Sequence, residues 1–210
     1  QELYRLSEST LLTFGFDSWR EEIDGQSTSI DSLTEGFPFP VPGGQDSVDT
    51  RVSASVPQNR WHALGVYASS EFDLKPLRVT AGGRFDAFWI STDETPAYTN
   101  SVGEPLPSED DSYTALNGSL GLVYPVFGAV NAVANVGTAF RVPNVVERYF
   151  YGSASGRETR PNPNVKPERS ASVDLGFKAV HERVNYSFTG FWSDYRDFTQ
   201  LQAFDSIQQG

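Results

Sequence analysis

Aromatic rings and arginines gather in one long polar segment of the sequence, residues 141–168. Three aromatic residues stand in a row at 149–151, and two arginines follow shortly after them. Guanidinium groups donate forked hydrogen bonds to anionic oxygens, and aromatic rings offer flat faces for stacking. We therefore expect this segment to contact an acidic, aromatic-rich ligand. The candidate residues are Arg141, Tyr149, Tyr151, Arg157 and Arg160.

A second interpretation of the same residues stays open. Tyrosines also form aromatic belts where strands cross a membrane surface, without touching a ligand. The arginines can in turn stay solvated or pair with a nearby carboxylate such as Glu158. The residue types alone do not separate ligand contact from this structural role.

Other reactive groups are scarce. The chain has no Cys, which excludes disulfides and thiolate metal sites, and its two histidines are His62 and His181. Neither histidine has the context of a catalytic triad, and GxSxG, P-loop and HExxH motifs are absent. The acidic segment 107–112, PSEDDS, lacks the spaced Asp and Gly pattern of a calcium loop. We therefore expect no enzyme activity, no cofactor and no metal site.

The charge balance limits the classes of partner that we expect. The 210 residues carry a formal net charge of -11, and Lys and Arg are not concentrated anywhere, so nucleic acid is not an expected partner. No apolar run approaches the roughly 20 residues of a spanning helix. A membrane barrel stays possible, because its strands carry a weaker signal. The first residue is Gln rather than Met, so we expect a processed product or a piece of a longer chain.

The apolar residues repeat with a period of two. Between residues 77 and 87, apolar or small side chains at odd positions alternate with mostly polar ones at even positions. The segments 116–124 and 171–179 show the same alternation. This pattern predicts β-strands that have one apolar and one polar face.

We expect eight strands joined by links of alternating length. The short links are SES, LKP, PVFG and HER, and the long ones cover 22–60, 92–111 and 141–168. Short turns at one end and long loops at the other are typical of an up-and-down transmembrane barrel, whereas a soluble sandwich usually keeps its links short. The expected strands lie near 2–6, 10–21, 61–73, 77–91, 112–124, 129–140, 169–180 and 183–197.

The distribution of charge over the two faces also favours a barrel. The polar face includes Arg84, Asp86 and Lys178, while the apolar face holds large side chains such as Leu77 and Phe85. A lipid-facing apolar band around a wet interior gives this arrangement. An ordinary antiparallel sheet with one solvated face is the alternative.

Four segments resemble signature sequences of the TonB-dependent outer-membrane receptors, which are plugged barrels of about 22 strands. AFRVPNVVERYF at 139–150 resembles the family's FRxPN…E box, and NPNVKPERSASVDLGF at 162–177 resembles its NPxLKPExS box. The segments 12–22 and 65–88 resemble two further barrel strands, so the motifs follow the family's order over most of the chain. The box residues are Phe140, Arg141, Pro143, Asn144, Asn162, Pro163, Lys166, Pro167 and Glu168.

The resemblance implies an all-β fold, an antiparallel up-and-down transmembrane β-barrel segment in the bacterial outer membrane. Family members begin with a periplasmic plug domain and a TonB box, and nothing in 1–60 resembles either. They end in a strand that closes on an aromatic residue, whereas this chain ends in SIQQG. We therefore expect residues 1–210 to be an interior barrel segment of about eight strands out of about 22, without the plug domain and the C-terminal closing strands.

The resemblance also implies transport rather than catalysis. Outer loops capture the cargo, the TonB complex supplies energy through the plug, and outer-membrane lipid surrounds the strands. The acidic, aromatic-rich ligand expected at 141–168 is then a ferric siderophore. Haem and cobalamin are the alternatives within the family, although haem receptors carry a His between the two boxes and this chain has none there. A small membrane-anchored or soluble β-rich binding or adhesion module is the alternative from another class.

The segment 22–60 is the longest link and is rich in Ser, Thr, Pro, Gly and Asp. This composition predicts a mobile and partly disordered loop. Phe37 and Phe39 would be further cargo contacts if the loop folds over the mouth of the barrel.

Overall fold

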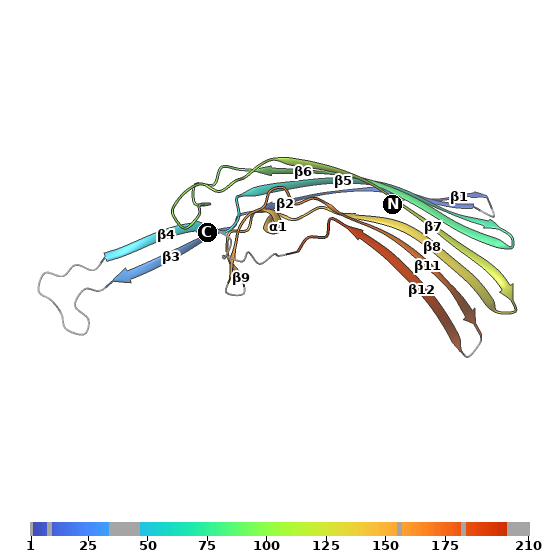
Figure 1. The fold of residues 1–210 in the computed structure, drawn as a ribbon. Helices are drawn as coiled ribbons and strands as arrows, with labels where there is room; N and C mark the ends of the chain where they lie inside the picture. Colours follow the sequence, from blue (N-terminus) through green and yellow to red (C-terminus); the bar gives the residue numbers. More distant parts are fainter. Residues whose placement is uncertain (1, 8–9, 34–46, 155–156, 182–183, 201–210) are drawn as a thin grey trace, which may run out of the picture.

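The computed structural model describes residues 2–7, 10–33, 47–154, 157–181 and 184–200. Its main feature is a curved, open sheet of eight strands in the order β1-β2-β5-β6-β7-β8-β11-β12 (Figure 1). Each neighbouring pair is antiparallel, so the main strands run up and down in chain order. The strands are β1 Glu2–Ser7, β2 Thr10–Ile23, β5 Asn59–Leu74, β6 Leu77–Thr92, β7 Asp111–Phe127, β8 Val130–Arg141, β11 Glu168–Val180 and β12 Asn185–Arg196.

All eight expected strands are present, with ends shifted by a few residues, and the short links lie between them as expected. One correction concerns PVFG, which was expected to be a turn. Strand β7 continues through Pro125 to Phe127, and the register with β8 shifts between these two residues. Proline has no N–H to donate, so it is tolerated at such an irregularity. The turn itself uses Gly128 at a φ of 51°, a left-handed conformation that favours glycine.

The segment 22–60 contains a hairpin. Strands β3 (Gln26–Leu33) and β4 (Ser47–Ala54) pair in antiparallel register, and Figure 1 shows them projecting beyond the end of the large sheet. The expectation of a partly disordered loop is therefore wrong for these strands. Their Thr, Val and Ile residues favour extended pairing, which the overall polar composition concealed. Phe37 and Phe39 lie outside the described residues.

The segment 141–168 contains three short elements. They are helix α1 (Val145–Tyr149) and the paired strands β9 (Gly152–Ala154) and β10 (Arg157–Thr159). Figure 1 shows α1 and β9 beneath the concave side of the sheet. The segment therefore turns back under the barrel wall before β11 begins. No helix in the described part of the chain is long and apolar enough to cross a membrane.

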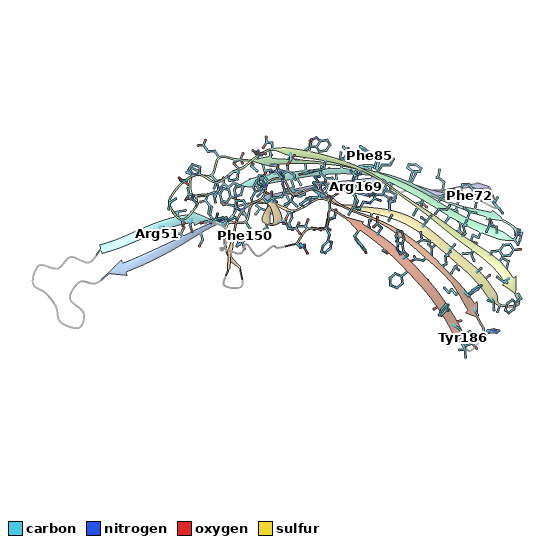
Figure 2. The ribbon with its side chains drawn as sticks, in the orientation of Figure 1. Arg51, Phe72, Phe85, Phe150, Arg169 and Tyr186 are labelled. Atoms are coloured by element: carbon cyan, nitrogen blue, oxygen red, sulfur yellow. The ribbon has the colours of Figure 1, made fainter. Side chains whose placement is uncertain are left out.

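The two faces of the sheet differ in chemistry. Val66, Phe85 and Leu116 form one row across three strands and are exposed, and Figure 2 shows Phe85 on the convex side. Asp86 lies on the opposite face, which it shares with Asp111 because side chains alternate along paired strands. Asp111 contacts helix α1, so the polar face is the concave one. This confirms the expected apolar outer band and polar interior.

The buried core lies at the end of the sheet that carries the long loops. One cluster contains Trp61, Ile90 and Val142, and a second contains Ala54, Tyr98, Val145 and Tyr149. The second cluster joins residues from three separate links between strands. The long loops therefore pack into a body of their own against the concave face. We call this part, residues 54–61, 90–113 and 140–168, the loop end.

Candidate functional site

Helix α1 begins with a capping box. The side-chain oxygen of Asn144 accepts a hydrogen bond from the N–H of Glu147 (2.9 Å), and the Glu147 carboxylate accepts one from the N–H of Asn144 (2.9 Å). Two donors at the start of the helix are thereby satisfied reciprocally. The first sequence box thus fixes the point where the chain turns beneath the sheet.

Arg141 joins the first sequence box to the second. Its Nη1 donates to both oxygens of Glu147 (2.9 and 2.8 Å), while its Nε and Nη2 donate to Glu168 (2.9 and 2.7 Å). Burial raises the pKa of Glu147, but the hydrogen bonds from Arg141 and Asn144 outweigh it, so this pKa lies below its usual value. Bidentate pairs of this kind fix orientation as well as distance. Arg141 therefore ties the end of β8 to the start of β11 and to α1.

Arg148 is a nearly fully buried charge, with a relative exposure of 1%. Its Nη2 donates to the carboxylate of Asp111 and to the carbonyl of Pro163 (2.9 Å). Its guanidinium carbon lies 4.9 Å from the ring centroid of Tyr149 and 5.9 Å from that of Tyr113. Nε and Nη1 find no hydrogen-bond partner in the described part of the chain. The buried positive charge is therefore stabilised mainly by the two aromatic rings and by the carboxylate of Asp111.

Arg141 and Arg148 of the first box form hydrogen bonds with residues of the second box. In the second box, Asn162 donates its N–H to the carbonyl of Arg148 (2.7 Å), and Pro163 accepts from the Arg148 side chain. Glu168 accepts from Arg141 and also from the N–H of Thr199 (2.8 Å). The expected return into the barrel at NPNVKPE is confirmed, since β11 begins at Glu168.

The remaining box residues differ in their burial and in the side chains that they contact. The ring of Phe140 lies 6.3 Å from that of Phe88, and the guanidinium of Arg169 lies 5.8 Å from Phe140. Pro143 is fully buried, Pro167 is half-buried and Lys166 is exposed. Most of the motif thus holds the loop end together.

Tyr98 fastens the link 93–110 to helix α1. Its hydroxyl donates to the backbone carbonyl of Tyr149, and the Tyr149 hydroxyl donates to the carbonyl of Glu109 (3.1 Å). Burial raises the pKa of both tyrosines. Tyr149 has a relative exposure of 0%, so its ring has no surface to offer a ligand. The expected cargo contact at Tyr149 thus has no exposed ring face in this structure.

A cavity of about 310 Å³ lies between the link 93–110 and the segment 151–161. Tyr151 and Arg160, two of the expected ligand-binding residues, line it together with Asn100 and Ser101. The Tyr151 hydroxyl accepts a hydrogen bond from the N–H of Ser101 (3.1 Å), which holds the ring at the wall. The structure thus brings an aromatic face and a guanidinium to one opening.

The other expected ligand-binding residues lie elsewhere or cannot be placed. Arg141 is bound to Glu147 and Glu168 and is not among the residues that line the cavity. Arg157 lies in β10, and its side chain falls outside the described ones. Asn100 and Ser101 were not expected, because a polar link gives no signal of which residues face a cavity.

The concave wall carries a second ionic network, between strands that are not neighbours. Arg84 on β6 donates to Asp17 on β2 (2.7 and 3.0 Å) and to Asp86 (2.8 and 3.0 Å). Strand β5 lies between β2 and β6, and Gly65 stands where the arginine crosses it. A Cβ at Gly65 would collide with the guanidinium, so the glycine makes the crossing possible. Tyr67 lies beside it, with the guanidinium carbon 5.9 Å from its ring.

Comparisons with known proteins agree with this architecture. Residues 3–210 match the family described as TonB dependent receptor-like, beta-barrel. Hemoglobin-haptoglobin utilization protein B of Neisseria meningitidis serogroup A is 25% identical over 149 residues, which cover 69% of this chain and 18% of that protein. The vitamin B12 transporter BtuB of Photobacterium profundum is 28% identical over 112 residues, 49% of this chain and 17% of that protein. The chain therefore spans less than a fifth of these relatives.

Solved structures resemble the fold over nearly the whole chain. The copper transporter OprC matches 93% of this chain with 29% of its own, at 15% identity and a TM-score of 0.63. The FrpB iron transporter from Neisseria meningitidis (F3-3 variant) matches 93% with 27% of its own, at 16% identity and a TM-score of 0.58. Taken with the open antiparallel sheet, the apolar convex face and the two interlocked boxes, the family match shows that this chain belongs to the TonB-dependent receptor-like β-barrels of the Gram-negative outer membrane.

Proposed function

We propose that the chain is part of a TonB-dependent receptor that takes up a ferric siderophore across the outer membrane. The observation that carries the proposal is the cavity at the loop end, where Tyr151 and Arg160 meet. Its volume of about 310 Å³ is at the lower end of the roughly 300–1,000 Å³ of small-molecule sites. It therefore accepts one acidic or aromatic arm of a chelate, and parts of the receptor beyond this chain bind the rest.

The loop end supports capture because it is held rigidly. Tyr98, Arg141 and Arg148 connect the link 93–110, helix α1 and the start of β11. Rigid positioning of a binding loop lowers the entropy lost when a ligand binds. The polar concave wall, with the Asp17–Arg84–Asp86 network, would face the plug through which the TonB complex acts.

Haem and cobalamin uptake are the competing functions, because the relatives are named for haemoglobin–haptoglobin utilisation and vitamin B12 transport. Haem iron needs a ligand such as His or Tyr. The interval between the two boxes has no His, and Tyr149 is buried with its hydroxyl bonded to Glu109. Tyr151 lines the cavity, but its hydroxyl already accepts a hydrogen bond from the N–H of Ser101. These observations favour a siderophore over haem.

The test is ligand binding by the complete receptor, measured by tryptophan fluorescence with ferric catecholate and hydroxamate chelates, haemin and cyanocobalamin. We expect binding of one class of ferric chelate. Arg160→Ala should weaken that binding about tenfold, as expected for the loss of a charge-assisted hydrogen bond. Lys166→Ala, which removes an exposed cation of the same segment outside the cavity, is the matched control and should bind normally. Binding of haemin or cyanocobalamin alone would reject the siderophore.

A further inference from the structure

The convex face of the sheet has a furrow along strand β8. Ala132 and Ala134 form its floor, and a cavity of about 430 Å³ lies above them. Leu122 and Tyr124 of β7 and Leu175 and Phe177 of β11 belong to the same lining. None of the residues that line this cavity is charged.

The pairing register explains the shape of the furrow. One row across the sheet reads Leu122, Ala134, Leu175, and the next reads Tyr124, Ala132, Phe177. In both rows a methyl group stands between two bulky side chains. The bulky residues lie two strand spacings apart, about 10 Å, so they form parallel ridges. Val136 continues the same face of β8 with a larger side chain and closes one end of the floor.

The furrow does not depend on strands beyond the chain. Strands β7, β8 and β11 each have a paired neighbour on both sides within the eight-stranded sheet. The floor and both ridges therefore lie on strands that are paired on both sides, and Leu77 of β6 and Phe188 of the edge strand β12 add to the lining. In the barrel, the convex face meets the hydrocarbon of the membrane, because the family places these strands in the outer membrane.

The furrow lies towards the short turns. Its lower row, which contains Tyr124, is close in sequence to the turn at 128–129, and Tyr186 lies beside the other turn of this end, as Figure 2 shows. Short turns of such barrels lie on the periplasmic side, and aromatic girdles mark the membrane surface. The aromatic end of the furrow is therefore at the periplasmic surface, and its length points into the hydrocarbon.

We propose that this furrow binds one acyl chain of a phospholipid from the periplasmic-side leaflet. The chain lies on the two alanines between the ridges, with its glycerol end near Tyr124 and its methyl end towards Val136. The Tyr124 hydroxyl is the one polar side-chain group of the lining and lies at the glycerol end, whereas a hydrocarbon chain gains close packing against both ridges. Lipid that only surrounds the barrel lacks such a bounded site.

The experiment uses the complete receptor, equilibrated with vesicles of phosphatidylethanolamine and phosphatidylglycerol, extracted in mild detergent and measured by native mass spectrometry. Ala132→Leu with Ala134→Leu fills the furrow with apolar atoms and keeps the face compatible with the membrane. We expect the fraction of receptor that retains one phospholipid to fall about fivefold, because the acyl chain loses its packing surface. Val136→Ala lengthens the floor and should raise that fraction.

The matched control is Ala68→Leu with Ala81→Leu, which makes the same change on the same face of β5 and β6 outside the furrow. This control should retain phospholipid like the wild type. Equal retention by the filled variant and the wild type would overturn the proposal, and so would an equal loss in the control. If the filled variant does not assemble, Val136→Ala still tests the proposal. An unchanged or lower fraction of receptor with one phospholipid would contradict the proposed site.

Discussion

Val145 and Tyr149 at the loop end have relative exposures of 1% and 0%, whereas Phe127 at the short-turn end is 70% exposed. Both places are rich in large apolar side chains. At the loop end they pack against one another and against a buried arginine, because residues from three long links meet beneath the wall. At the other end the turns are too short to cover anything.

This difference separates two sources of stability. The loop end is held by contacts within the chain, among them the pairs of Arg141 and Arg148 with carboxylates. The convex face and the turns depend on surrounding lipid, where an apolar side chain is already in a favourable environment. Substitutions at the loop end should therefore change local stability, while equivalent ones on the outer face should change it little.

The largest effect is expected from Asp111→Ala. Among the described residues, it leaves the buried guanidinium of Arg148 with the Pro163 carbonyl as its one hydrogen-bond acceptor, at a cost of about 3 kcal/mol. Amide hydrogen exchange of the complete receptor, followed on peptides from 142–151, should show protection reduced by roughly a hundredfold. Asp73→Ala, on the same polar face at the short-turn end, is the control and should stay within about 0.5 kcal/mol.

A matched pair of valines compares the two environments directly. Val145→Ala removes two methyl groups from a closed cluster and should cost about 1.5 kcal/mol, whereas Val66→Ala on the convex face should cost about 0.5 kcal/mol or less. Urea unfolding in detergent micelles would detect the difference in the free energy of unfolding. Equal losses would show that the loop end is not a packed core.

Arg141→Gln should have a smaller effect. The arginine is partly exposed, so its pairs with Glu147 and Glu168 are screened, and their loss should cost about 1 kcal/mol. Exchange protection should fall in α1 and at the start of β11 together, because one side chain holds both. Arg78→Gln removes the exposed pair with Glu71 at the other end and should leave both regions unchanged. A loss confined to α1 would contradict the bridging role.

The sequence predicted the sheet well because alternation is a local property. Residues 77–87 show their two faces without knowledge of their partners, and the link lengths gave the up-and-down order. The packing of the loop end was harder to predict from the sequence. The capping box at Asn144 and Glu147 could have been found from its spacing, but the burial of Tyr149 and Arg148 depends on Tyr98 and Asp111, which lie far away in sequence. Aromatic and basic residues look alike in sequence whether they face a ligand or a core.

The smallest effect is expected from Tyr98→Phe, which removes the hydroxyl that donates to the Tyr149 carbonyl and should cost roughly 0.5–1 kcal/mol. Burial raises the pKa of Tyr98 above its ordinary value of 10.0. The stability that the neutral phenol contributes is therefore fully present below pH 10 and is lost as the pH rises through the folded pKa, because the phenolate cannot donate. Tyrosinate absorbance during alkaline titration should show one fewer late-ionising group in Tyr98→Phe than in the wild type. If the wild type and Tyr98→Phe show the same number of late-ionising groups, the Tyr98 phenol is not buried as the structure requires.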